Sequence, residues 1–145
     1  MTANSHTHIT LRTATEADIP RITEFIRPFV EEGRLLPRTF NELEELLNNF
    51  YLAEIEGEIV GCAALEVYSP KLAEIRSLAV ASHVRGSGIG RLLVDACLQE
   101  ARRRNILEVM VVTSEDGFFL RMGFDFTLPG EKKALFFQTR DNPDT

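Results

Sequence analysis

The residues with the clearest chemical meaning lie between Arg85 and Gly90, where the sequence reads Arg-Gly-Ser-Gly-Ile-Gly. A β-rich run ending at Val80 precedes this segment, and a helical pattern begins at Gly88. Glycines at alternate positions let consecutive main-chain N–H groups turn toward a ligand without side-chain obstruction. The first turn of a helix adds unsatisfied N–H donors and a partial positive charge. The segment therefore predicts a pyrophosphate-binding site, with Arg85 and Arg91 adding full charges at its rim.

Two common nucleotide-binding loops do not fit this spacing. The dinucleotide fingerprint requires G-x-G-x-x-G, whereas Gly86, Gly88 and Gly90 follow G-x-G-x-G. The phosphate loop of nucleoside triphosphatases requires Lys and then Ser or Thr after its last glycine, but Arg91 and Leu92 follow here. A plainer interpretation, a glycine-rich turn that only caps a helix, stays open on this segment alone.

The surrounding sequence predicts the strands and helices that would position this loop. Alternating or continuous apolar runs predict strands, and apolar residues at helical spacing next to capping residues predict helices. The expected strands span 9–12, 50–55, 59–68, 72–80, 107–112, 124–128 and 134–139. The expected helices begin near Asp18, at the Thr39 capping box, at Gly88 and at Phe118. We expect Pro28 and Gly33 to end the first helix and strand 107–112 to be buried on both faces.

The composition is that of an ordinary globular domain. The chain has 145 residues, 44% apolar and 26% charged, so we expect one domain over 1–145 with loose tails at 1–8 and 141–145. A formal net charge of -6 argues against nucleic-acid binding, and no apolar run is long enough to cross a membrane. Cys62 and Cys97 lie far apart without partners at metal-ligand spacing. We therefore expect two buried thiols, no metal site and a cytoplasmic location.

The segment from Leu78 to Gly90 resembles the acetyl-CoA loop of the GNAT superfamily of N-acetyltransferases, in which R-G-x-G-x-G follows a strand ending in L-A-V. The resemblance covers nearly the whole chain and implies the GNAT fold, a mixed α/β architecture whose mostly antiparallel sheet is flanked by helices. Within the superfamily, the chain is most similar to the acetyltransferase domain of N-acetylglutamate synthase. The matching segments are 26–28, 31–33, 36–39, 59–65, 73–75 and 128–133.

The resemblance implies direct transfer of acetyl from the thioester of acetyl-CoA to an amine. A bulge in the strand before the loop, at 78–80, would free main-chain groups to stabilise the oxyanion. The short helix that contains Phe119 would pass the CoA thiol. The residues expected to bind acetyl-CoA are Leu78, Ala79, Val80, Arg85, Gly86, Ser87, Gly88, Ile89, Gly90, Arg91 and Phe119.

The general base implied by the resemblance is Glu74, which matches an acidic residue of the synthases and would act through water. Strand alternation places Glu74, Arg76 and Leu78 on one face. A salt bridge between Glu74 and Arg76 at a sheet edge is the alternative interpretation of both residues.

The leaving thiolate needs a proton donor that is missing from the usual position of the family. Many GNAT enzymes have a tyrosine four residues before the glycine of the short helix, where this chain has Phe119. Thr113 or Ser114, just after the predicted strand 107–112, could protonate the thiolate directly or through water. The thiolate could also leave unprotonated, because thiols titrate near pH ~8.5.

Three arginines are candidates for binding the acceptor, because guanidinium groups bind carboxylates through paired hydrogen bonds. Arg38 and Arg140 fall on positions that resemble the substrate-binding arginines of the synthases, and Arg76 is a third candidate. The serine that the synthases carry shortly after Arg140 is missing. Glutamate is the first candidate acceptor from the arginines, but the missing serine weakens the case for glutamate specifically, and glutamine or another acidic amino acid stays open.

We expect an amino-acid N-acetyltransferase of arginine biosynthesis that acts on a small-molecule amine and can form a homodimer. Two alternatives stay open. One is a GNAT enzyme for another small amine or a protein amino group, and the other is a catalytically silent acetyl-CoA-binding regulator. The absence of tyrosine at Phe119 keeps the regulator open as an alternative, and the presence of Glu74 argues against it.

Overall fold

The computed structural model describes residues 8–126 and 134–140, and these divide into two compact units after Val111. The predicted tails at 1–8 and 141–145 fall largely or wholly outside the described residues, as does the segment 128–133. Each unit is described by itself below.

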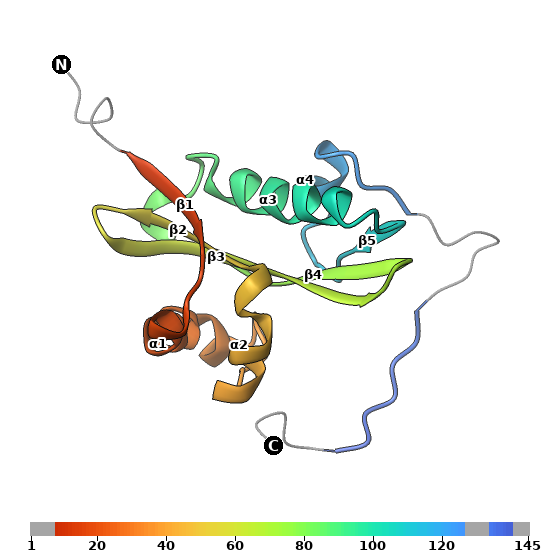
Figure 1. The fold of residues 1–145 in the computed structure, drawn as a ribbon, viewed down its shortest axis with the longest axis horizontal. Coiled ribbons are helices and arrows are strands. Elements are labelled where there is room, and N and C mark those ends of the chain that lie inside the picture. Colours follow the sequence, from red (N-terminus) through yellow and green to blue (C-terminus); the bar gives the residue numbers. More distant parts are fainter. Residues whose placement is uncertain (1–7, 127–133, 141–145) are drawn as a thin grey trace. The chain divides into compact units, whose positions relative to one another are not determined.

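The first unit is built on a five-stranded sheet with the strand order β1-β2-β3-β4-β5 (Figure 1). The strands are β1 Ile9–Thr13, β2 Phe50–Ile55, β3 Glu58–Ser69, β4 Leu72–Val80 and β5 Glu108–Met110. Neighbouring strands run antiparallel except for β4 and β5, which are parallel. The predicted mixed α/β fold with a mostly antiparallel sheet is confirmed.

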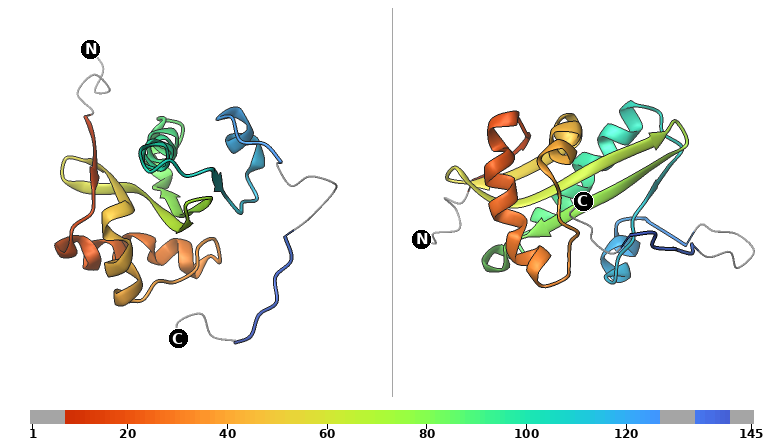
Figure 2. Two further views of the ribbon diagram at one scale, coloured as in Figure 1. Left: turned by 45° about the vertical axis from the view of Figure 1, so that its right-hand side comes forward. Right: turned by 90° about the horizontal axis from the view of Figure 1, so that it is seen from below.

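Helices cover both faces of this sheet. The helices α1 Ile19–Glu31 and α2 Phe40–Leu46 lie on one face, and α3 Ile89–Arg103 lies on the other (Figures 1 and 2). Burial of apolar side chains against the sheet stabilises this layered arrangement by about 1.5–3 kcal/mol for each large side chain. Fully buried members of the core beneath α1 and α2 are Ile22, Leu43, Phe50 and Leu52.

The helix α1 begins as predicted but runs past its proline. It has Pro20 in its first turn and continues through Pro28 to Glu31, so the prediction that Pro28 ends the helix is wrong. A proline in a helix removes one main-chain hydrogen bond. The buried side chains of Ile22 and Ile26 hold the turns before Pro28 against the sheet, and this packing outweighs the lost bond.

Asp18 precedes α1 but does not cap it with its side chain. Its buried carboxylate instead accepts hydrogen bonds from Thr15 N and from both terminal nitrogens of Arg12, each at 2.8 Å. Arg12 and Arg21 also bind Glu54 on β2, at 3.1 and 3.0 Å. The four charged side chains form an ion-pair network that ties the start of α1 to β1 and β2.

The last strand of the sheet, β5, is shorter and less buried than predicted. It spans Glu108–Met110, and Leu107 and Val112 on either side are 70% and 60% exposed. A strand that is buried on both faces needs elements packed over both faces of its sheet. None of the three residues of β5 is buried, and within the described residues β5 pairs only with β4, over 72–74. The prediction of a buried strand over 107–112 is therefore wrong.

The second unit contains the short helix α4 Asp116–Arg121, followed by Gly123 with φ of 100° at the predicted C-terminal position. The ring of Phe119 is buried and meets Phe118 and Phe124 edge to face, with ring centroids 5.0 and 5.2 Å apart. Strands were predicted at 124–128 and 134–139. The described parts of these segments contain no strand, because no described residue pairs with them to complete a ladder.

Candidate active site

The glycine-rich segment forms the turn between β4 and α3. A single 3₁₀ turn, Ser82–Val84, follows the strand, and Gly86 and Gly88 then adopt φ of 83° and 89°. These values lie in the left-handed region, where glycine avoids the strain that a β-carbon would cause. Ser87 lies between the two glycines, and its main-chain N–H bonds to Val84 O at 3.3 Å. The chain thus reverses tightly in front of the helix.

The first turn of α3 keeps its main-chain donors available. Gly88 is the N-cap residue and provides no side chain to satisfy them. The N–H of Leu92 bonds to Gly88 O at 3.0 Å. The N–H groups of Ile89, Gly90 and Arg91 precede this first helical bond and face the N-terminal end of the helix, where the helix dipole is positive. Such a turn suits a pyrophosphate.

Two features of the loop reinforce this arrangement. The side chains of Arg85 and Arg91 are exposed, and neither forms an ion pair within the described residues. Gly61 on β3 lies under the start of α3, where an added β-carbon would come within 2.9 Å of Ile89 Cγ2 and Leu93 Cδ1. The glycine therefore allows α3 to approach the sheet closely and fixes the position of the loop.

A bulge interrupts β4 just before the loop. Arg76 lies opposite Ala64 of β3, and the next paired residue of β4, Ala79, lies opposite Cys62. Two residues of β4, 77 and 78, therefore lie opposite a single residue of β3, Ala63. A bulge was predicted within 78–80, and the observed one begins one position earlier.

The bulge changes which side chains share a face of β4. Arg76 and Ala79 both pair with β3 residues that belong to the core beneath α1 and α2. Because cross-strand partners point to the same side, Leu78 faces away from Arg76 and Glu74. The prediction that Glu74, Arg76 and Leu78 share one face is wrong for Leu78, since the extra residue reverses the alternation.

Ser77 holds the bulge in place. Its φ of 56° lies in the left-handed region, which costs a residue other than glycine about 1–2 kcal/mol. Two hydrogen bonds offset this strain: Arg38 Nε donates to Ser77 Oγ at 3.2 Å, and Cys62 Sγ donates to Ser77 O at 3.2 Å. Burial raises the pKa of Cys62 to about 12, so this thiol stays protonated and unreactive. Cys97 is buried as well, as predicted for both thiols.

Arg38 reaches the bulge from the start of α2. The capping box predicted there is present, with Thr39 Oγ1 accepting from Glu42 N at 3.2 Å and the Glu42 carboxylate accepting from Thr39 N at 2.8 Å. The box fixes the backbone next to Arg38, whose side chain is only 7% exposed. Burial lowers the pKa of Arg38, and the positive charge of Arg76 lowers it further.

Charged side chains gather around Arg38 on this face of the sheet. Glu66 Oε1 lies 3.4 Å from Arg76 Nη1 and 3.8 Å from Arg38 Nη2. Glu74 lies directly opposite Glu66 across the β3–β4 ladder and accepts a hydrogen bond from Tyr68 Oη at 2.7 Å. These five residues are referred to below as the β3–β4 cluster. Within the described residues Arg76 pairs with Glu66 rather than Glu74, so the alternative salt bridge is not observed.

The structure thus brings together three predicted site residues, Arg38, Arg76 and Glu74. Sequence reasoning missed Glu66 and Tyr68. The sequence contains a signal for them. The apolar run of β3 is followed by Glu66 and Tyr68, and two residues that are two positions apart on a strand lie on the same face.

The other predicted site residues belong to the second unit. Thr113 Oγ1 accepts a hydrogen bond from Glu115 N at 2.9 Å, and Ser114 is exposed. Phe119 is buried in the aromatic group of α4, and Arg140 is exposed. The roles of these four residues stay predictions.

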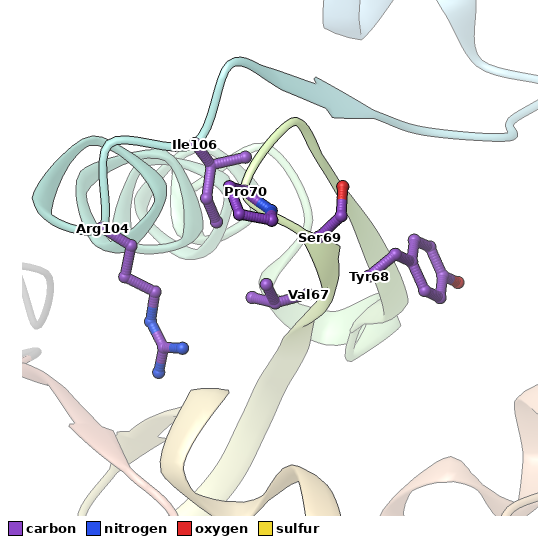
Figure 3. A pocket seen from close by; sticks show the side chains of 6 residues that line it. All are labelled: Val67, Tyr68, Ser69, Pro70, Arg104 and Ile106. Carbon is purple, nitrogen blue, oxygen red and sulfur yellow. The ribbon is translucent and has the colours of Figure 1, made fainter.

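A hollow of about 430 Å³ lies elsewhere on the first unit (Figure 3). Its lining residues are Val67, Tyr68, Ser69, Pro70, Arg104 and Ile106. Arg104 follows the C-terminal end of α3, so the hollow lies at the opposite end of this helix from Gly88. The Tyr68 ring points away from Ile106 and Arg104, toward the other side of the strand (Figure 3). The hollow is therefore separate from the pyrophosphate loop.

In the part of the chain that the structure describes, no group of three or more His, Cys, Asp or Glu side chains is arranged to hold a metal ion. None of the described helices combines the length and the apolar character needed to cross a bilayer.

The sequence matches the model of the acetyltransferase (GNAT) family over residues 18–124. It is 40% identical over 114 residues to an uncharacterized N-acetyltransferase of Chlorobaculum tepidum, covering 79% of this chain and 74% of that protein. An amino-acid acetyltransferase of Mycobacterium tuberculosis is 38% identical over 117 residues, covering 79% of this chain and 67% of that protein. That of Pasteurella multocida is 34% identical over 133 residues, but the chain spans only 30% of its length.

Solved structures agree with this family assignment. A Mycobacterium tuberculosis protein in complex with CoA matches with a TM-score of 0.75 and 35% identity over 86% of this chain and 76% of that one. N-acetylglutamate synthase from Neisseria gonorrhoeae, complexed with coenzyme A and N-acetyl-glutamate, matches with a TM-score of 0.72 and 31% identity over 80% of this chain and 28% of that one. With the family model, the sheet and the loop in agreement, the chain belongs to the GNAT family and is an acyltransferase that uses acetyl-CoA.

Proposed function

We propose that this enzyme transfers the acetyl group to the α-amino group of a small acidic amino acid, with glutamate as the first candidate. The β3–β4 cluster carries the proposal. Arg38 and Arg76 offer guanidinium groups to the carboxylates of an amino acid, and both now contact Glu66, which such a carboxylate would replace. Glu74 offers a negative charge on the same face to the ammonium group. Arg140 is proposed as a third contact to the acceptor.

The donor is proposed to bind along β4 and the loop that follows it. The N–H groups of the loop would bind the pyrophosphate, with Arg85 and Arg91 adding charge. The main-chain groups of Leu78, Ala79 and Val80 would stabilise the oxyanion. Two observations support this placement: the ladder between β4 and β5 ends at Glu74 within the described residues, and the bulge redirects the backbone that follows.

The proposed reaction is a direct transfer. Glu74, acting through water, accepts a proton from the acceptor ammonium, and the free amine attacks the thioester carbonyl. A C–N bond forms, the attacking nitrogen gives its second proton to water, the C–S bond breaks and CoA leaves as a thiolate. Thr113 or Ser114 is proposed to protonate this thiolate, and Phe119 to line the space near the sulfur. Departure without protonation is also open, because thiols titrate near pH ~8.5.

The relatives support glutamate as the acceptor, since several are named amino-acid acetyltransferases and the Neisseria synthase was solved with N-acetyl-glutamate. We propose on this basis a role in arginine biosynthesis in the cytoplasm. We further propose that residues 1–145 form one domain and that two copies associate.

The test is release of free CoA thiol from acetyl-CoA in the presence of a panel of amino acids and amines. The proposal expects the highest kcat/KM with glutamate or a close acidic analogue. A lysine-containing peptide as the best acceptor would instead select protein acetylation. A thermal shift with acetyl-CoA but no thiol release with any amine would select a silent regulator.

A further inference from the structure

Tyr68 is the one member of the β3–β4 cluster to which the proposed reaction gives no role. It lies near the end of β3, its side chain is 49% exposed, and its hydroxyl donates to Glu74 Oε1 at 2.7 Å. This is a short bond to a charged acceptor, the stronger class of hydrogen bond in proteins. The phenol and the proposed general base therefore act as a pair.

The ladder explains why Glu74 needs such a partner. Its direct neighbour across the ladder is Glu66, and two carboxylates facing each other repel. Glu66 is drawn toward Arg76 at 3.4 Å, and Tyr68 reaches Glu74 diagonally from two positions further along β3. Each carboxylate thus has its own donor. The bond to Oε1 leaves Oε2 of Glu74 without a side-chain donor among the described residues.

We propose that Tyr68 is a positioning residue that holds Glu74 by Oε1, so that Oε2 faces the water or amine whose proton is removed. The inference rests on the proposed function of Glu74 as general base. Tyr68 can play this part because it keeps its own proton: burial, followed by the hydrogen bond to Glu74, raises the pKa of Tyr68 to about 12.

The proposal predicts how the loss of the hydroxyl divides between kcat and KM. The hydrogen bond fixes the orientation of the Glu74 carboxylate, and without it the carboxylate can turn away from the acceptor. Removing the phenol hydroxyl should therefore lower kcat and leave the KM for acetyl-CoA close to wild type. The other charged groups around Glu74 would stay in place. They are Glu66 on β3, Arg76 on β4, Arg38 before α2 and Glu108 on β5, two residues before Met110, the ladder partner of Glu74.

The experiment compares Tyr68→Phe with Tyr51→Phe, a control tyrosine on β2 that does not contact Glu74. We expect Tyr68→Phe to lower kcat about tenfold and to leave the KM for acetyl-CoA within about twofold. The Tyr51→Phe variant should keep the wild-type kcat and KM.

The double variant Tyr68→Phe/Glu74→Gln separates this inference from the proposed function. If Tyr68 acts through Glu74, the double variant should be no slower than Glu74→Gln alone. A wild-type kcat in Tyr68→Phe, with Glu74→Gln slow, would overturn the role of Tyr68 and keep Glu74 as the base. Wild-type turnover in Glu74→Gln would overturn both.

Discussion

Arg38 is buried against the bulge of β4, where its Nε donates a hydrogen bond to Ser77 Oγ at 3.2 Å. The bond joins two parts of the proposed site, because Arg38 belongs to the proposed acceptor side and Ser77 begins the bulge that precedes the backbone proposed to bind the oxyanion. Arg38 Nη2 also lies 3.8 Å from Glu66 Oε1. One buried side chain thus connects acceptor binding with the geometry of β4.

Arg38→Ala should raise the KM for the amino-acid acceptor about 10- to 100-fold, because it removes a carboxylate-binding group from a buried site. Arg38→Lys should recover only part of the affinity, since an ammonium group lacks the planar fork. Arg27→Ala, which removes an exposed arginine of α1, is the control and should leave the KM unchanged. Steady-state kinetics with varied acceptor provide the measurement. Equal KM values in wild type and Arg38→Ala would remove Arg38 from the acceptor site.

Glu74→Gln should lower kcat about 10²- to 10⁴-fold, because the amide cannot accept the proton of the ammonium group. Calorimetry should give an affinity for acetyl-CoA close to that of wild type. Glu74 lies six residues before Val80, where β4 ends, and so outside the glycine-rich turn. The matched control is Glu58→Gln, which makes the same substitution at an exposed carboxylate at the start of β3 and should keep the wild-type kcat. Turnover that survives Glu74→Gln would exclude the residue as the base.

Much of this framework is predictable from local sequence. The β4 bounds at Leu72–Val80 and the α3 core agree with the alternating and helical patterns, since each pattern reflects which side is buried. The predicted strands 50–55 and 59–68 are joined by a tight turn at Glu56 and Gly57, with φ of 52° and 81°. The bulge escaped exact placement because Ser77 adopts its unusual φ through bonds to Arg38 and Cys62, which are distant in sequence.

Gly86→Ala should weaken acetyl-CoA binding at least about tenfold, because a β-carbon strains the left-handed backbone and occupies the ligand side of the turn. Gly57→Ala is a closely matched control, because φ is 83° at Gly86 and 81° at Gly57, and an added β-carbon meets no atom within 4 Å at either position. Both variants should lose similar stability, so a difference in the dissociation constant reports on the ligand alone. Identical affinities in the two variants would argue against the loop as the binding site.

The ion-pair network at the start of α1 should make stability depend on pH. The hydrogen bond from Arg12 holds the pKa of Asp18 well below its usual range despite burial, and Glu54 is shifted the same way. Carboxyls with a lowered folded-state pKa stabilise the fold above the unfolded value of about 4 and lose this effect as pH falls through the folded-state values. Unfolding free energy should therefore drop on acidification below about pH 4.

Asp18→Asn should lower the unfolding free energy by about 2–3 kcal/mol at pH 7, because it leaves two arginines with a neutral partner. The same variant should show a shallower loss of stability below pH ~4, since one of the titrating groups is gone. Urea unfolding at a series of pH values measures both effects. Asp95→Asn, at an exposed position of α3, should match wild type at every pH. A wild-type pH slope in Asp18→Asn would contradict the proposed origin of the acid sensitivity.

Sequence reasoning missed Glu66 and Tyr68 because their positions next to Glu74 depend on the register between two strands. Glu66 and Glu74 meet only because β3 and β4 pair with this particular alignment, and Tyr68 reaches Glu74 across the same ladder. A sequence pattern gives the face on which each residue lies, but register follows from the turn between the strands and from the bulge. The length of β5 was overestimated for a related reason, because an apolar sequence does not show whether a second neighbour is present along its edge.

The most direct test of the account follows the main-chain amides of the loop by ¹H–¹⁵N NMR during titration with CoA and, separately, with acetyl-pantetheine, which lacks the pyrophosphate. The account predicts that CoA shifts the amide signals of Gly86, Gly88 and Gly90 strongly, and that acetyl-pantetheine leaves them nearly in place. The amide of Gly57 should not move with either compound. CoA binding that leaves the three loop glycines unshifted would contradict the central claim that these amides hold the pyrophosphate.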